Sequence, residues 1–503
     1  NVNDKEKVYL LKKIICVKNY QPKSVLLFTL LVFSFLLLIV FSMPKGGFSL
    51  FGVNWRFLSV EALFHPKKNN KKNIDAIIQK VDTTNLNSSL KKYKGKSSVE
   101  LGAANGGDLS ANASVELDIN EQVSQNLDRF FKKLKNIAAL KEKLSIFHYG
   151  DSQIEGDRMT AYFRQRLQTQ FGGNGPGMIP ALNVYNTQTF KQTFSDNFER
   201  LTAFWGAKLT SKKYGAMGSV GVFKIDSSQT LKGEPTTAWI EIDASKNAYG
   251  RAREYNHVRF YYNSCVKPCL LKVFQNGQLI HEDSLKTDGN AHSITLDFPG
   301  SPGKLKYLLS STKSPVISGF SLEGDIGVQV TNVAMRGSSG TNFSSMDQPL
   351  FRNMHSELNT QLFILQFGGN TIPGLKDSSS VRYYAKSFKR QIQLIQSQVP
   401  EAAIIVIGPS DMSQLNEGVF ESYNLIPYLT NQMKKVSVES GAAYWDLFKA
   451  MGGKNSMPTW VEQGLAGSDY IHFTSKGTSI ASQLFYDAFI SSYSKWELKN
   501  QVE

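Results

Sequence analysis

The strongest constraint on the fold is an alternation of short apolar runs with amphipathic helical patterns in two separate parts of the chain. The first part holds the run 145–150 (SIFHYG), which follows a helical pattern over 119–144 and precedes another over 158–171. Parallel strands that are buried on both faces read as continuous apolar runs with helices between them. The alternation therefore predicts an α/β fold, a parallel sheet covered by helices on both faces. The later apolar runs and helical patterns of this alternation are 362–369, 381–398, 402–409, 425–440, 442–448 and 474–491.

The pattern changes between these two parts. Segments such as TTAWIEID, HVRFYYNS and HSITLDFP are short, rich in β-formers and separated by Gly, Pro, Asn or Asp. This composition is typical of an antiparallel β-sandwich. We therefore expect an α/β domain over residues 119–175 and 331–494, interrupted by an inserted β-sandwich over 176–330.

Near the amino terminus, Val25–Met43 is a run of nineteen residues without charge. As a helix it would rise ~28 Å, close to the ~30 Å thickness of a hydrocarbon core. A cleavable signal peptide is the alternative, but MPKGG after the run contains no small-x-small cleavage motif. We expect a transmembrane anchor over 24–43.

The flanks of this span predict its orientation. Six lysines precede it, whereas Lys45 and Arg56 are the only nearby cations after it. Because positive flanks stay inside, residues 1–23 are expected to be a cytoplasmic tail, with the rest of the chain on the periplasmic or extracytoplasmic side of the cytoplasmic membrane.

The net charge of +15 is concentrated near the span. Residues 1–100 carry seventeen Lys and Arg against six Asp and Glu, which leaves only +4 for the other 403 residues. We therefore expect the excess to meet anionic lipid or wall polymer, and nucleic acid is not an expected partner because no aromatic and basic reading module is present. Residues 44–118, rich in Asn, Lys, Ser and Gly, are expected to form a flexible stalk with a short helix around 74–81.

Two cysteines, Cys265 and Cys269 (CVKPC), would face an oxidising compartment in this topology. A local disulfide is therefore expected, with two free thiols as the alternative. Zinc binding is not expected, since no second ligand pair at suitable spacing accompanies them.

The first candidate site motif is Gly150-Asp151-Ser152, at the end of the run 145–150. A nucleophilic serine needs an exposed hydroxyl, and the N–H groups at the start of a following helix can stabilise developing negative charge. Alone the motif is weak, because Gly, Asp and Ser are ordinary loop residues. Ser152 is the candidate nucleophile.

A second motif, Asp469-Tyr470-Ile471-His472, supplies a candidate base and its orienting carboxylate. A serine hydroxyl needs a neighbouring base, and that base needs an acid to fix its tautomer. An Asp three residues before a His can lie on the same turn. His148 is the rival base, although its place within a strand favours a packing role.

Two further motifs offer donors for an oxyanion. Gly368-Gly369-Asn370 follows the run LFILQF, and the Asn370 amide can donate there. Arg336-Gly337-Ser338-Ser339-Gly340 follows VTNVAM, where the N–H of Gly337 is the candidate and that of Gly340 the alternative. Plain turns would explain each motif alone. All four motifs, however, fall at predicted carboxyl ends of strands, where open α/β sheets place their sites.

Together the four motifs resemble the SGNH (GDSL) hydrolases, whose signature Ser, Gly, Asn and His fall on Ser152, Gly337, Asn370 and His472. Many members have Asp where this chain has Thr371. The resemblance covers 145–180 and 330–493. It implies a three-layer α/β/α domain, a Ser152–His472–Asp469 triad, and an oxyanion hole from Ser152, Gly337 and Asn370.

FGGNGPGMIP, the β-rich insertion, and YWDLFKAMGG before DYIHFTSKG resemble the peptidoglycan O-acetylesterase branch of that family. In that branch the inserted domain resembles a carbohydrate-binding module, here expected to be jelly-roll-like. The resemblance implies a serine esterase that removes O-acetyl groups from cell-wall glycan through an acetyl-serine intermediate, without cofactor or metal. Oligomeric state stays open.

Other functions are consistent with the same motifs. An O-acetyltransferase would use the same acyl-enzyme, and a lipid esterase is disfavoured because no apolar lid segment lies near the motifs. A non-catalytic glycan-binding envelope protein is the alternative from another class. In the insertion, Trp239, Tyr261 and Tyr262 could stack on sugar rings, although core packing is the commoner role of such residues.

Overall fold

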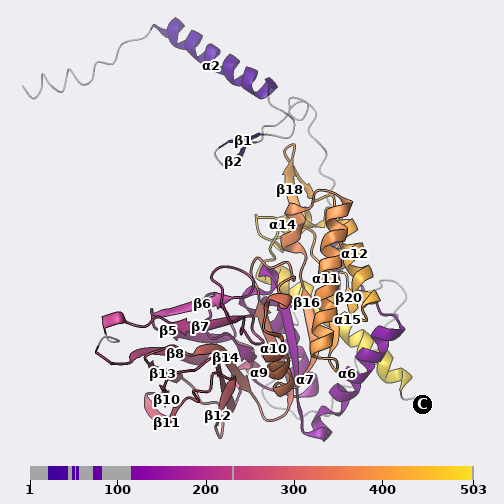
Figure 1. Cartoon of the computed structure of the whole chain (residues 1–503). Coiled ribbons are helices and arrows are strands. Elements are labelled where there is room, and N and C mark those ends of the chain that lie inside the picture. Colours follow the sequence, from indigo (N-terminus) through magenta and orange to yellow (C-terminus); the bar gives the residue numbers. More distant parts are fainter. Residues whose placement is uncertain are drawn as a thin grey trace, which may run out of the picture. The chain divides into compact units, whose positions relative to one another are not determined.

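The computed structural model describes residues 21–42, 48–50, 53–55, 72–81, 115–228 and 232–500 (Figure 1). The chain divides into two compact units, one made of Asn1–Asn70 with Leu415–Phe420 and the other of Lys71–Gln414 with Glu421–Glu503. In the first unit, helix α2 (Pro22–Ser42) precedes a short antiparallel pair, β1 (Phe48–Leu50) and β2 (Val53–Trp55).

Helix α2 contains the predicted span. Its window Pro22–Ile39 is long and apolar enough to cross a bilayer, and none of that window is buried. A membrane span and a signal sequence share these properties. Of the predicted cytoplasmic tail, residues 1–20 lie outside the described residues.

The second unit is built on a five-stranded parallel sheet, which confirms the predicted α/β class. Alternate side chains of each strand point to opposite faces: Ile146 belongs to the apolar core on one face and Phe147 to the core on the other. β3 is an inner strand and pairs with both β15 and β16. The strands, in spatial order, are β15 (Gly327–Ala334), β3 (Lys143–Gly150), β16 (Thr360–Gln366), β17 (Ala403–Ile407) and β20 (Ala443–Trp445).

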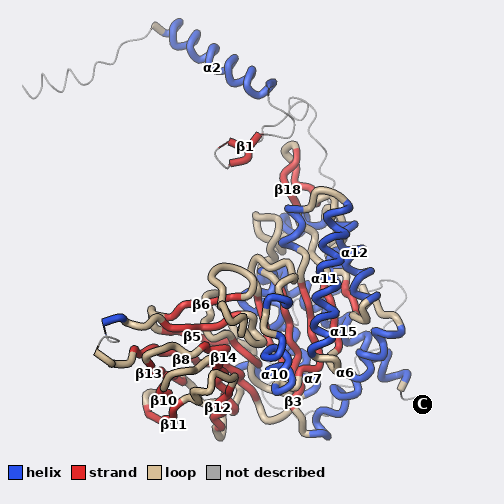
Figure 2. Tube along the Cα trace, in the orientation of Figure 1, coloured by secondary structure: helices blue, strands red, loops and turns tan. Residues whose placement is uncertain are grey.

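Helices cover both faces of this sheet, which gives three layers (Figures 1 and 2). The helices on the two faces contribute their apolar stripes to separate cores. On one face lie α6 (Glu121–Leu140), α7 (Arg158–Phe171) and α15 (Ser475–Lys499). On the other lie α10 (Gln348–Glu357), α11 (Ser378–Gln398) and α12 (Ile426–Glu439).

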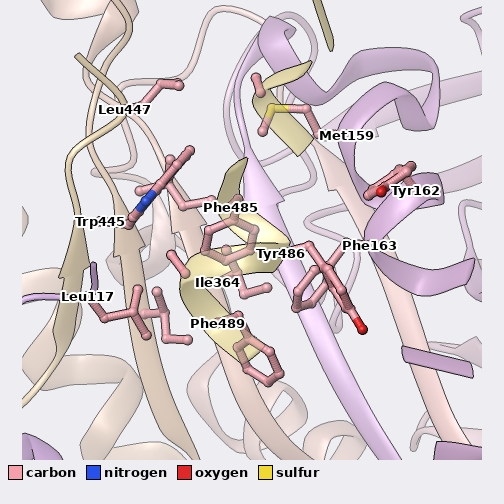
Figure 3. Packing of buried hydrophobic residues seen from close by; sticks show 14 of the residues in the cluster. Leu117, Met159, Tyr162, Phe163, Ile364, Trp445, Leu447, Phe485, Tyr486 and Phe489 are labelled. Atoms are coloured by element: carbon pink, nitrogen blue, oxygen red, sulfur yellow. The ribbon is translucent and has the colours of Figure 1, made fainter. Parts of the chain in front are cut away.

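The carboxyl-terminal helix α15 is held by aromatic packing (Figure 3). The Phe485 ring lies between two partners, with centroids 5.1 Å from Phe163 of α7 and 5.2 Å from Trp445 of β20. One turn on, Phe489 meets Phe163 edge-on at 5.3 Å. Edge contacts of this kind add to the burial of large apolar rings, so they fix the helix whose first turn follows the His472 loop.

The inserted segment forms two antiparallel sheets that share an apolar core, as predicted for a sandwich. Its central residues include Ile240 and Tyr307 from one sheet and Phe260 and Phe320 from the other. The first sheet has β11 (Gln278–Ser284), β10 (Cys269–Gln275), β13 (Leu305–Ser311), β8 (Thr236–Ala244) and β5 (Phe190–Phe194). The second has β12 (His292–Asp297), β9 (His257–Asn263), β14 (Val316–Glu323), β7 (Ser219–Phe223), β6 (Phe198–Thr202) and β4 (Gly177–Ile179).

The two parts of this unit meet through a continuous core. Tyr214 and Val220 of the insertion belong to the same apolar cluster as Phe147 and Phe363 of the parallel sheet. The parallel sheet resumes at Gly327 with β15, ahead of the predicted boundary at residue 331. The insertion is thus packed against the parallel-sheet domain rather than suspended from it.

Part of the predicted stalk is folded, which corrects the expectation for 44–118. Helix α4 (Asp75–Lys80) lies where a short helix was predicted, but Ile74 and Val81 at its ends are buried in the main core. Further on, the N–H of Asp118 donates to the carbonyl of Tyr444 beside β20 (2.7 Å). These segments bury a few apolar side chains, although their composition is polar on average. For that reason the sequence pattern alone does not predict that they join the core. Residues 82–114 lie outside the described residues.

The expected disulfide is absent: Cys265 and Cys269 are both free and buried. The Cys265 thiol instead donates to the carbonyl of Lys267 (3.4 Å), while Cys269 begins β10. Burial raises the pKa of the Cys269 thiol to about 12, so this side chain acts as a small apolar residue.

The other elements that the structure describes are short helices and strands in loops: η1 (Ser152–Asp157), α9 (Gly250–Arg253), η2 (Phe343–Ser345), η3 (Gly369–Gly374), β18 (Ser413–Asn416), β19 (Val419–Ser422), α13 (Leu447–Ala450) and α14 (Ser456–Glu462).

Candidate active site

Ser152 stands at the carboxyl end of the inner strand β3, as the first residue of η1. The turn before it requires glycine, because a Cβ on Gly150 would lie 2.9 Å from the Ile154 side chain and 3.0 Å from the Gln366 carbonyl oxygen. The Asp151 carboxylate caps the turn by accepting the N–H of Gln153 (3.0 Å). Strand, glycine and cap together present the Ser152 hydroxyl at the sheet edge.

The loop before α15 carries His472 and Asp469 on one turn. One carboxylate oxygen of Asp469 accepts the N–H groups of Ile471 and His472, both at 3.0 Å. The other lies 2.7 Å from Nδ1 of His472. Partial burial acts to raise the pKa of Asp469, but these hydrogen bonds from His472 outweigh it and hold that pKa below its ordinary value. Asp469 is thus an ionised carboxylate that fixes the imidazole.

The turn that carries Ser152 and the loop that carries His472 are in contact. Nε2 of His472 lies 2.8 Å from Oγ of Ser152, although the residues are 320 positions apart in the chain. The order Ser152, His472, Asp469 is therefore continuous through hydrogen bonds. This geometry is what a serine needs for transfer of its proton to a base whose tautomer is fixed by an acid.

The two predicted oxyanion residues line the same cavity as this pair. Gly337 has a left-handed backbone (φ 79°) and begins the segment after β15, and Asn370 lies in η3 after β16. Nδ2 of Asn370 donates to the carbonyl of Ser338 (3.1 Å), and the amide also bonds to the Asp151 carboxylate. The N–H groups of Ser152 and Gly337 donate to no residue that the structure describes. Two main-chain donors thus remain for a ligand, and the Asn370 amide lines the same cavity.

The cavity has a volume of about 780 Å³ and polar walls from both parts of the unit. The parallel-sheet domain contributes the four signature residues, and the insertion contributes three more. The lining residues are Ser152, Glu155, Gly156, Arg158, Tyr162, Asn186, Gln188, Tyr249, Arg336, Gly337, Asn370, His472, Ser475, Thr478 and Ser479.

A comparison with solved structures finds a peptidoglycan O-acetylesterase with a TM-score of 0.57 and 21% identity, over 73% of this chain and 96% of that one. The chain has the SGNH-hydrolase fold. Two more distant matches are a family two carbohydrate esterase from Clostridium thermocellum (TM-score 0.22, 11% identity, 52% of this chain and 94% of that one) and a salicylyl-acyltransferase from a tetracycline biosynthetic pathway (0.25, 12%, 60% and 97%). No family model and no curated protein matches the sequence.

In this SGNH-fold chain, two residues that the motifs did not reveal connect the serine turn to the histidine loop. Nε2 of Gln153 donates to the carbonyl of Ile471 (2.7 Å), and the Arg158 guanidinium donates to that of Phe473 (3.3 Å). Arg158 also donates to the carbonyls of Ser152 and Glu155. Side chains next to the serine therefore hold the main chain on both sides of His472. Arg158 belongs to none of the four motifs, and only its contact with a distant loop shows its role.

The alternative residues have other partners. His148 is buried between Gln366 and Thr160, and burial lowers its pKa to about 3, so it stays neutral and packed. The N–H of Gly340 donates to the Ser338 hydroxyl (3.0 Å) and is not free for an oxyanion.

The aromatic residues proposed for sugar stacking do not form a surface. Tyr261 and Tyr262 are buried, and Lys306 lies over the ring of Trp239 at 4.8 Å. No group of three or more His, Cys, Asp or Glu side chains suited to a metal ion occurs within the described part of the chain.

Proposed function

We propose that this protein is a serine esterase that removes O-acetyl groups from a cell-wall polysaccharide, peptidoglycan above all. The observation that carries the proposal is the continuous hydrogen-bonded order Ser152–His472–Asp469, which opens into a cavity with Gly337 and Asn370. The fold shared with a peptidoglycan O-acetylesterase supports the choice of ester class.

The proposed reaction proceeds through an acetyl-serine intermediate in two steps. His472 takes the proton of Ser152 as Oγ attacks the acetyl carbonyl carbon, and Asp469 stabilises the imidazolium that forms. The oxyanion is held by the N–H groups of Ser152 and Gly337 and by the amide of Asn370. His472 returns the proton to the departing sugar oxygen, which leaves acetyl-Ser152. Water then attacks the acetyl group with His472 as base, which yields acetate and free serine.

The shape of the cavity supports a bulky, polar substrate. Its volume of about 780 Å³ exceeds the space an acetyl group needs, and its walls present hydroxyl, amide and guanidinium groups. A long-chain lipid ester would leave these polar groups without hydrogen-bond partners. A sugar hydroxylated on several carbons can hydrogen-bond to them.

Helix α2 supports the proposed location. As a membrane anchor with lysines on its amino-terminal side, it would hold the catalytic unit on the outer side of the cytoplasmic membrane, beside the wall glycan. Lys232 is exposed, and in a Lys232→Cys variant the new thiol should react with a membrane-impermeant maleimide in intact spheroplasts if this orientation holds. The thiol should be protected from the reagent if the unit is cytoplasmic.

The proposed activity is tested with the full chain in detergent. Acetate release from O-acetylated peptidoglycan is measured for wild type, Ser152→Ala and Ser479→Ala. Ser479 lines the same cavity but bonds only to the carbonyl of Ser475, so it is the matched serine. We expect release to disappear in Ser152→Ala and to persist in Ser479→Ala. Undiminished acetate release by Ser152→Ala would refute the assignment of Ser152 as the nucleophile.

The same assay separates an esterase from an acetyltransferase. Adding a de-O-acetylated glycan fragment as acceptor should leave acetate as the product if water is the acceptor. Conversion of the acyl group chiefly to acetylated fragment would instead assign a transferase, because the acyl-enzyme would then favour the sugar hydroxyl.

A further inference from the structure

One wall of the cavity comes from the insertion, and an unusual aromatic residue of the insertion lies beside it. Asn186, Gln188 and Tyr249 line the cavity from that side. Trp205, in the loop after β6, is 73% exposed, which is matched among the described large apolar side chains only by Tyr383. A Trp left this open to water forgoes burial of a large apolar ring, so the face of its indole is free to pack against a ligand.

The position of Trp205 points to the substrate. A Cβ placed on Gly337 would lie 3.9 Å from Cε3 of the indole, so the ring is next to a glycine that lines the cavity. The indole therefore lies at the edge of the cavity that holds Ser152. A group bound on the indole would adjoin the ester being cleaved.

The loop is held on both sides of Trp205, so the exposure does not come from a loose backbone. The N–H of Trp205 donates to the Thr202 hydroxyl (3.0 Å), and that hydroxyl donates to the Trp205 carbonyl. Asn342 and Ser345, in the segment after Gly337, both contact the carbonyl of Ala203 (3.5 and 3.4 Å). Because folding has already ordered the loop, a ligand would bind without paying for its immobilisation.

A pyranose ring fits this surface. The weakly positive C–H groups on one face of a sugar complement the negative face of an indole, while its hydroxyls need polar partners nearby. Arg336, Asn186 and Gln188 supply such partners on the cavity side. Arg336 is itself held by an ion pair with Glu155 and lies over the Tyr185 ring at 4.4 Å. An apolar face beside fixed polar groups is the usual composition of a sugar site.

We infer that Trp205 forms a sugar subsite at the cavity edge, which binds the face of a pyranose ring of the glycan next to the acetylated residue. The inference rests on the proposed esterase function. It makes the insertion part of substrate recognition, through a loop anchored on the domain that carries out the chemistry.

The test compares two substrates and two aromatic residues with the full chain in detergent. Kinetics on O-acetylated glycan strands and on p-nitrophenyl acetate are measured for wild type, Trp205→Ala, Trp205→Phe and Tyr383→Ala. We expect Trp205→Ala to lower the ratio of kcat/KM on glycan to kcat/KM on the small ester about tenfold, chiefly through KM. Trp205→Phe should recover part of that ratio. Tyr383, equally exposed but on α11, should have no effect.

A second measurement, of binding, tests the subsite without relying on turnover. Binding of de-O-acetylated glycan fragments is titrated calorimetrically into Ser152→Ala and into Ser152→Ala with Trp205→Ala. Weaker binding by the double variant supports the subsite even if no acetate is released, in which case the esterase proposal alone fails. Equal binding by the two proteins, or an unchanged substrate ratio in Trp205→Ala, overturns the subsite.

Discussion

The side-chain amide of Gln153 donates to the carbonyl of Ile471 across 2.7 Å, and this bond joins the residue after the nucleophile to the residue before the base. The donor is buried and belongs to the turn that begins at Ser152. With Arg158 on Phe473, it holds the histidine loop against the serine turn. The 2.8 Å separation of Ser152 and His472 thus depends on groups that take no part in proton transfer.

Gln153→Ala should lower kcat by about tenfold to a hundredfold while KM changes little, because a shift of about 1 Å between catalytic groups costs up to ~100-fold. Gln153→Glu keeps the size but lacks the N–H donors, so it should be at least as slow. The measurement is steady-state kinetics on p-nitrophenyl acetate, with the melting temperature as a check on folding. A wild-type rate in folded Gln153→Glu would contradict the positioning role.

Asn370→Ala should reduce kcat about 100- to 1000-fold, since loss of one oxyanion donor costs ~2.7–4 kcal/mol of transition-state stabilisation. The Asn370 amide lines the cavity beside Ser152, positioned by its bonds to the carbonyl of Ser338 and the carboxylate of Asp151. Labelling by a serine-directed phosphonate should slow as well, because its addition also develops negative oxygen charge. Thr371→Ala, at the neighbouring position, serves as the control, and equal kinetics in both variants would remove Asn370 from the oxyanion hole.

Asp469→Asn should lower kcat by several orders of magnitude and leave the fold intact, since an amide at this position no longer fixes the imidazole tautomer that accepts the Ser152 proton. The ionised state of Asp469 comes from its hydrogen bonds to His472. Rates with p-nitrophenyl acetate and the rate of phosphonate labelling report the loss. If Asp469→Asn and wild type react equally fast, another acid orients His472.

Asp411 should make the protein more stable as the pH falls from about 7 to about 4. The side chain is fully buried beside Ser422 and Met457, and burial raises its pKa from 3.8 to about 6. The folded state then binds a proton more tightly than the unfolded state, so protonation stabilises folding by up to about 3 kcal/mol once the pH is below both values.

The test is the melting temperature of wild type and Asp411→Asn between pH 7.5 and pH 4.5. Asn does not titrate, and although it loses an acceptor for Met457, its melting temperature should rise less on acidification. A rise of the same size in both proteins would show that other groups cause the pH dependence.

Ile74→Ala should lower the free energy of unfolding by about 2–5 kcal/mol, as is usual when a large core side chain is truncated. Ile74 is 1% exposed and lies against Gly452 in the main core, outside the part of the chain that the motifs identify. Gln79→Ala, an exposed position of the same helix, should have little effect. Denaturant unfolding of the two variants tests whether this segment is part of the catalytic unit.

The order of the elements could be read from local patterns. The helix predicted over 158–171 coincides with α7, and the run 145–150 lies within β3, because apolar periodicity and length act over a few neighbouring residues. Helix α10 (Gln348–Glu357) was not expected, since its apolar positions lie within a polar segment. Segment 72–81, predicted as a short helix in a flexible stalk, is polar on average for the same reason, and its burial in the core is not evident from its composition.

Local patterns of residues were enough to predict the type of fold and the four motifs, because backbone periodicity and turn chemistry depend on neighbouring residues. The tertiary structure alone decided the 2.8 Å contact of Ser152 with His472, the links from Gln153 and Arg158 to the histidine loop, and the place of Trp205 beside Gly337. Each of these joins segments far apart in the chain. Their distances depend on how helices and sheets pack together, which no local pattern encodes.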